Sequence, residues 1–260
     1  MSSVCANRAD LSTGFLLRGR EIPGLPRVAR PDETNGMTET KWARVTHWTG
    51  IGGVGLFVAA CVIGGWRLPG YSHVANHISE AYATGTPLGV ELRFLGFIPA
   101  GILFAVFAWG ARRIAPKSAV ATAGFLILGF FYGLGTSVCG LFPCDLGCGR
   151  LGGRPSVSQL IHDITGLATY LTVPAGLILL GVAARGWPGG QRVARAGLVG
   201  GTVAVVGALL FLGDVRGSFA GLFQRIVESA VLLWIVIGAH YFADGARRGP
   251  EPTGLACDRR

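Results

Sequence analysis

Residues that could perform chemistry gather in one segment of the chain, residues 140–166, which reads GLFPCDLGCGRLGGRPSVSQLIHDITG. The segment contains two cysteines and, near its end, the adjacent pair His162 and Asp163. An imidazole oriented by a carboxylate, here Asp163 or Glu228, can act as a general base, with Ser79 or a metal-bound water as the nucleophile. The segment could therefore support general acid–base chemistry with His162 as the base.

A second pair of ionisable residues, Arg225 and Glu228, lies at positions i and i+3 of a long apolar run. A lone ionised side chain in the middle of a bilayer costs about 2.5–3.5 kcal/mol, so such residues are expected to point into the protein and to pair. The predicted pairs are Asp163 with Arg225 and Glu228 with His162. The helix face that we expect to point inward carries Gln159, His162, Asp163 and Gly166.

Two histidines and a glutamate precede this segment, His73, His77 and Glu80, at positions i, i+4 and i+7. On a helix this spacing presents all three side chains on one face, where they could bind zinc with His162 as a fourth ligand. The HxxxH spacing also arises often by chance, and we favour an interfacial helix held by hydrogen bonds over a metal site. We expect no metal and keep these three residues as the alternative.

Cys144 and Cys148 lie in a short glycine-rich stretch, and Cys139 lies just before it. In an oxidising compartment, two cysteines this close are expected to form a disulfide. Three cysteines leave one over, so Cys144 with Cys148 competes with pairings that include Cys139.

The elements that must position these residues are membrane helices. Of the 260 residues, 50% are hydrophobic and 14% are charged, whereas about 25% of an average soluble protein is charged. The chain carries a formal net charge of +9, but its basic residues lie singly or in pairs at the ends of apolar runs. This pattern is typical of membrane topology and argues against nucleic acid as a partner.

The predicted fold is all-α, a polytopic membrane protein with six transmembrane helices in one bundle. Each span is close to the roughly 20 residues that cross the hydrocarbon core. We expect a disordered tail over residues 1–41, the membrane domain over 42–244 and a second tail over 245–260. Between the first two spans, Val74, Ile78 and Ala81 recur at helical spacing, which predicts a short helix on the outer surface. The spans are Thr46–Gly65, Phe94–Arg112, Ser118–Phe142, Ser158–Ala184, Ala196–Gly213 and Leu222–Tyr241.

The distribution of lysine and arginine predicts the orientation. The two tails and the second and fourth loops hold 17 of these residues, while the first, third and fifth loops hold five. We expect the protein to lie in the cell membrane. Because cytoplasmic segments carry the excess of positive charge, both termini are expected in the cytoplasm.

Three runs of the sequence, in order, resemble a known family: YSHVANHISEAYATGTP, FPCDLGC and SQLIHDITGLATYL. They are similar to motifs of the bacterial membrane family named domain of unknown function 998, which has an ISELG-like motif, an FPCD-x-GC segment and an IHN or IHD helix. Ala81 and Tyr82 replace the usual Leu-Gly of the first motif. The resemblance runs from Tyr71 to the end of the sixth span and implies a six-helix membrane protein with no assigned reaction.

Two functions fit these patterns, beside a purely structural or partner-binding role. We expect the polar cluster on the outer side to bind a lipid or small amphiphile, which needs only shape and a few fixed polar groups. The alternative is an intramembrane, hydrolase-like enzyme acting on a lipid-like substrate, with His162 as general base beside Asp163. The chain has no visible internal repeat, which disfavours transport. Membrane lipids are the expected partners and no cofactor is expected. The predicted binding residues are Ser79, Glu80, Gln159, Arg225 and Glu228.

Overall fold

The computed structural model describes residues 33–149 and 151–248, and every regular element within them is helical. The elements are α1 (Glu33–Arg67), η1 (Ile78–Tyr82), α2 (Gly89–Leu92), η2 (Arg93–Phe97), α3 (Ile98–Ile114), α4 (Ala119–Ile127), η3 (Leu128–Leu134), α5 (Gly135–Leu141), α6 (Val157–Ala184), α7 (Gln191–Gly213) and α8 (Ala220–Arg248).

Within the part of the chain that the structure describes, six continuous helical stretches are long and apolar enough to cross a membrane. The second is built from α2, η2 and α3, and the third from α4, η3 and α5. The predicted all-α fold with six transmembrane helices is therefore confirmed. The stretches are Glu39–Arg67, Gly89–Ile114, Ala119–Leu141, Val157–Ala184, Gln191–Gly213 and Ala220–Gly245.

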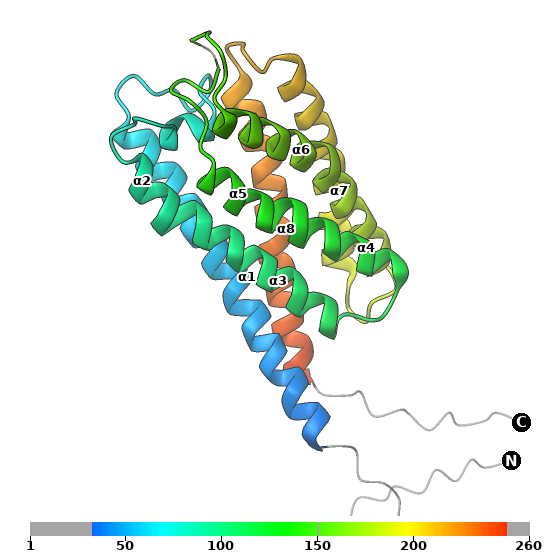
Figure 1. The fold of residues 1–260 in the computed structure, drawn as a ribbon. Coiled ribbons are helices and arrows are strands. Elements are labelled where there is room, and N and C mark those ends of the chain that lie inside the picture. The colour runs from blue at the N-terminus through cyan, green and yellow to red at the C-terminus, as the bar shows by residue number, and fades with distance from the viewer. Residues whose placement is uncertain (1–32, 150, 249–260) are drawn as a thin grey trace, which may run out of the picture.

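The six spans form a closed ring in which each span packs against the next along the chain. α8 completes the ring by packing against α1 as well as α7. The start of α1 and the end of α8 lie at the same end of the bundle (Figure 1). The opposite end carries the loops at residues 68–88, 142–156 and 214–219, and we call it the distal end.

The centre of the ring is filled with aromatic and branched side chains. Phe104, Phe107, Trp234 and Leu177 are all completely buried there. Glycines bring α6 and α7 into close contact, because a Cβ atom added to Gly197 would lie 2.6 Å from the Gly181 backbone. Small residues between membrane helices have this packing role in general.

Two spans contain a π-helical turn, η2 in the second and η3 in the third. Pro99 follows η2, and its nitrogen has no hydrogen to donate to the carbonyl group one turn earlier. η3 contains Tyr132, which is buried and faces the interior. π-turns of this kind often occur where a side chain is placed for function.

The loop after α1 differs from its prediction. The expected surface helix through Val74, Ile78 and Ala81 is not formed, and its only helical part is the short 3-10 helix η1. Val74 is exposed, whereas every residue of η1 is buried. The loop turns into the bundle because its polar groups form hydrogen bonds with residues there. The helical spacing of its apolar residues was therefore misleading.

α1 begins at Glu33, inside the segment predicted as the N-terminal tail. The rest of that tail, residues 1–32, lies outside the described residues, as do residues 249–260 of the predicted C-terminal tail.

Candidate functional site

A cavity of about 370 Å³ lies in the distal half of the bundle. Side chains from α1, η1, α6, α7 and α8 line it, together with the third span. Four of the predicted catalytic and binding residues are among them, namely Ser79, His162, Asp163 and Glu228. Phe57, Phe97, Leu167 and Phe211 supply apolar surface on the same walls. The cavity therefore combines polar groups with an apolar lining.

Glu228 lies at the inner wall of this cavity, and both of its carboxyl oxygens accept hydrogen bonds from tyrosines. The Tyr132 hydroxyl donates to Oε2 at 2.8 Å, and the Tyr170 hydroxyl donates to Oε1 at 2.7 Å. The two tyrosines come from the third and fourth spans, so Glu228 joins three helices. The predicted pair of Glu228 with His162 is wrong, since tyrosine hydroxyls already satisfy the carboxyl group.

His162 is 9% exposed and is held by the end of the preceding helix. Its Nδ1 lies 3.0 Å from the Phe142 carbonyl oxygen and 3.3 Å from that of Cys139. The last carbonyl groups of a helix lack partners within it, and here the imidazole supplies one. Because carbonyl oxygens only accept, Nδ1 carries the hydrogen, and Nε2 of the neutral ring is left as an acceptor.

Asp163 takes a different position from the one predicted. It is exposed at the rim of the cavity, and its Oδ1 accepts a hydrogen bond of 2.7 Å from Nε2 of Gln159. Gln159 is only 2% exposed and also accepts from the Asp145 backbone through Oε1. The predicted pair of Asp163 with Arg225 is therefore wrong, and the two residues serve different parts of the distal end.

Arg225 connects α8 to the loop after α1. Nη1 donates to the Asn76 carbonyl at 3.0 Å and to the Gly221 carbonyl at 2.9 Å, and Nη2 donates to the Tyr71 hydroxyl at 2.6 Å. The guanidinium also lies over the Tyr71 ring. Burial raises the pKa of Tyr71 to about 12, although the nearby Arg225 charge acts in the opposite direction. The neutral hydroxyl thus donates in turn to the His77 carbonyl at 2.8 Å.

Glu80 closes the same loop on itself. Its Oε1 accepts from the His77 backbone at 2.8 Å, and its Oε2 accepts from the Asn76 side chain at 2.7 Å. The His77 side chain points toward the loop between α7 and α8, where its Nε2 lies 2.8 Å from the Val215 carbonyl oxygen. His73 is exposed and contacts the Tyr71 ring instead.

The zinc alternative at His73, His77 and Glu80 is therefore not assembled, because these residues do not share a helix face. Within residues 33–149 and 151–248, no three His, Cys, Asp or Glu side chains converge as a metal site.

A disulfide links Cys144 to Cys148, with their Cα atoms 5.0 Å apart, and Cys139 is a free thiol. The disulfide packs on η1, since the Ser79 hydroxyl lies 3.3 Å from Sγ of Cys148. Thr84 also donates its backbone N–H to the Cys144 carbonyl at 2.9 Å. Of the three possible pairings, the structure therefore contains the one between Cys144 and Cys148. The hydroxyl of Ser79, the expected nucleophile, contacts a disulfide sulfur rather than a base.

The disulfide loop is anchored to the start of α6 through Asp145. The Ser156 backbone N–H donates to Oδ2 of Asp145 at 2.9 Å, and hydrogen bonds from Ser156 lower the pKa of this carboxyl group. Ser156 in turn caps α6 by accepting from the Gln159 backbone at 3.1 Å. The FPCD segment and the IHD helix are therefore joined directly.

Several residues at this site were missed from the sequence. Gln224 accepts from the Ile78 backbone at 2.7 Å, and its position one turn before Glu228 was a usable signal. Tyr170 lies two turns after His162 on the same face of α6, which was also visible. Asn76 and Tyr132 had no comparable pattern, because a loop and a π-turn place them.

The ring of six apolar spans and the polar distal end define the class of this protein. It is an α-helical integral membrane protein with a cavity of mixed polar and apolar lining at one end of its helix bundle. Compared with known families, the chain belongs to the one described as "Protein of unknown function (DUF998)", which it matches over residues 51–241. No curated protein and no solved structure matches it. The three motifs that resembled this family all lie at the distal end, around the cavity.

Proposed function

We propose that the distal cavity binds the polar end of a membrane lipid or of another small amphiphile. The observation that carries this proposal is a cavity of about 370 Å³ with polar and apolar walls inside a membrane bundle. Ligand sites are typically about 300–1,000 Å³ and combine an apolar lining with a few fixed polar groups. This cavity is at the small end of that range, so it fits a head group or a short chain.

The chemistry of the walls supports a ligand with charges of both signs. Asp163 and Arg216 both line the cavity and supply opposite charges. His162 adds an acceptor at Nε2, because its Nδ1 hydrogen is committed to backbone carbonyls. A zwitterionic head group such as phosphoethanolamine would meet complementary groups in this arrangement, while its chain would lie against Leu167 and Phe211.

The hydrolase alternative has less support. A nucleophile activated by a base needs the two side chains within hydrogen-bond reach. The hydrogen bonds of Ser79 and His162 lead to Cys148 and to backbone carbonyls, and Asp163 holds Gln159 rather than the imidazole. Binding is therefore the function that these contacts favour.

Filling the cavity tests the proposal. Gly166 lines the cavity, and a Cβ atom added there meets nothing within 4 Å. Gly166→Leu should fold normally and reduce binding of phosphatidylethanolamine by about tenfold or more, because the longer side chain occupies ligand space. The measurement is native mass spectrometry of the full chain in detergent, titrated with that lipid.

The matched control for this variant is Gly55→Leu. Gly55 also has open space at its Cβ position but lies on α1 outside the cavity lining. It should bind the lipid like the original chain. Equal binding by the Gly166 and Gly55 variants would contradict the proposal.

We also propose that the distal end faces the outside of the cell membrane, with both termini in the cytoplasm. The excess of lysine and arginine on the opposite side supports this orientation. So does the disulfide of Cys144 with Cys148, since disulfides persist in oxidising compartments.

Thiol labelling of whole cells tests this orientation. A membrane-impermeant maleimide should leave Cys148 unlabelled at first and should label it after treatment with an impermeant reductant. Cys257, in the C-terminal tail, should react only after the membrane is permeabilised. Labelling is located by mass spectrometry of peptides. Reaction of Cys257 in intact cells would show that the C-terminus lies outside the cell and would contradict the proposed orientation. Reaction of Cys148 without reductant would show that its thiol is free and that the disulfide is not formed.

A further inference from the structure

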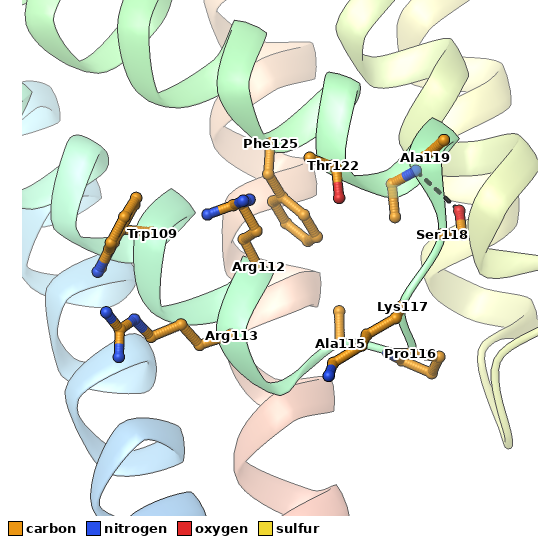
Figure 2. Close-up of a pocket in the computed structure, with 11 residues that line it drawn as sticks. Trp109, Arg112, Arg113, Ala115, Pro116, Lys117, Ser118, Ala119, Thr122 and Phe125 are labelled. Carbon is orange, nitrogen blue, oxygen red and sulfur yellow. Dashed lines mark hydrogen bonds between the residues drawn. The ribbon is translucent and has the colours of Figure 1, made fainter.

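A second hollow, of about 640 Å³, lies at the end of the bundle opposite the distal cavity. It is formed by the end of α3, the connection at residues 115–118 and the first turns of α4 (Figure 2). Because two apolar spans end and begin here, the hollow lies at the depth where lipid head groups meet the hydrocarbon. Nothing in the distal site depends on it.

The charge of this hollow is of one sign. Arg112, Arg113 and Lys117 line it, and none of the described residues that line it is acidic. The preference for positive charge on one side of a membrane explains why cations occur in this connection. It does not explain why three of them surround a single concave space.

Aromatic rings hold the arginines in place. The Arg112 guanidinium lies over the Trp109 ring at 5.3 Å from the ring centre, and that of Arg113 lies over Trp109 at 5.0 Å and over Trp42 at 4.9 Å. Figure 2 shows the Arg112 side chain between the rings of Trp109 and Phe125. Rings at this depth are typical of the interface between lipid and water.

Arg112 also has an unsatisfied donor. Its Nε is completely buried and has no hydrogen-bond partner among the described residues. A buried donor without an acceptor is unfavourable. The protein would therefore be stabilised if the guanidinium turned toward an acceptor in the hollow and formed a hydrogen bond with it. A phosphate oxygen is the acceptor that matches the planar arrangement of arginine donors best.

From these observations we propose that the hollow formed by Arg112, Arg113 and Lys117 binds a phosphate group at the membrane surface. Its most accessible source is the head group of an anionic phospholipid, whose chains would run along the apolar surfaces of α3 and α4. Anionic lipids are attracted to basic groups next to a membrane span. Free phosphate shares the same chemistry.

The test is native mass spectrometry of the full chain in detergent, titrated with phosphatidylglycerol and with phosphatidylcholine. The original chain should bind phosphatidylglycerol more tightly. Arg112→Gln should weaken this binding by about tenfold, the effect of one lost charge-assisted hydrogen bond. Lys117→Gln, at an exposed side chain, should weaken it about threefold and serves as the second variant if Arg112→Gln unfolds.

The matched control is Arg192→Gln, which removes the same charge from an exposed residue on α7 outside the lining of the hollow. It should bind phosphatidylglycerol like the original chain. Inorganic phosphate that displaces phosphatidylglycerol from the original chain would identify free phosphate as the ligand of the same site. Equal binding of the two lipids, or equal losses from Lys117→Gln and Arg192→Gln, would overturn the proposal. Gly166→Leu, which fills the distal cavity, should not change phosphatidylglycerol binding at this hollow. A negative result for the proposed distal site would therefore leave this proposal unaffected.

Discussion

Glu228→Ala is expected to lower the free energy of unfolding by about 2–4 kcal/mol, because it leaves the hydroxyl groups of Tyr132 and Tyr170 without their acceptor. Both tyrosines are buried between spans, so their hydroxyl groups can be solvated again only from the cavity that they line. Thermal unfolding in detergent, followed by circular dichroism, measures the effect. Asp163→Ala is the comparison, since it removes an exposed carboxylate from the same cavity and should cost less than half as much.

The cause of this loss can be separated from the loss of side-chain volume. In a background with Tyr132→Phe and Tyr170→Phe, no donor is left unpaired when Glu228 is replaced by leucine. Removing all partners of a buried polar group together is often nearly neutral. The triple variant should therefore be more stable than Glu228→Ala. A triple variant as unstable as the single one would show that the tyrosine bonds are not the reason.

The spans were predictable from the sequence because a long apolar run in a membrane folds as a transmembrane helix. A backbone in hydrocarbon must satisfy its own hydrogen bonds, so each run becomes a helix. The exact ends were less predictable. The second span begins at Gly89, before the expected Phe94, because α2 extends it with a polar first turn that includes Glu91.

The position of the site was predictable but its contacts were not. Polar residues in an apolar chain must gather, and Ser79, His162 and Glu228 do line one cavity. The ion pairs predicted for Glu228 and Arg225 assumed that charges seek opposite charges. Tyrosine hydroxyls and backbone carbonyls satisfy these groups instead, and they carry no charge that a sequence pattern would reveal.

The loop after α1 shows why spacing alone misled the prediction of a metal site. Helical periodicity in YSHVANHISEAY indicated one face for His73, His77 and Glu80. The carboxylate of Glu80 instead accepts from the backbone N–H of His77, which caps the start of η1, so the short helix begins at Ile78 and leaves His73 and His77 outside it. Local bonds between side chain and backbone compete with helix formation in this way.

Arg225→Ala is expected to release this loop from α8. Arg225 is the side chain that ties Asn76 and Tyr71 to Gly221, through three hydrogen bonds of 3.0 Å or less. Without them, amide hydrogen exchange in residues 71–84 should become faster by about tenfold or more. Hydrogen exchange followed by mass spectrometry measures this. Arg93→Ala is the control, because the Arg93 side chain donates to the Gly89 carbonyl one turn before it, and its removal should leave the loop unchanged.

A double-mutant cycle decides which partner of Arg225 matters. Arg225→Ala and Tyr71→Phe remove two ends of the same bond, so their effects on thermal unfolding should overlap by about 1 kcal/mol. Arg225→Ala and Asp163→Ala have no shared partner and should add to within about 0.5 kcal/mol. The opposite result, with coupling to Asp163 and none to Tyr71, would restore the ion pair suggested by the sequence. It would also mean that the loop is held on α8 by the backbone bond from Leu222 to Val74 rather than by the guanidinium.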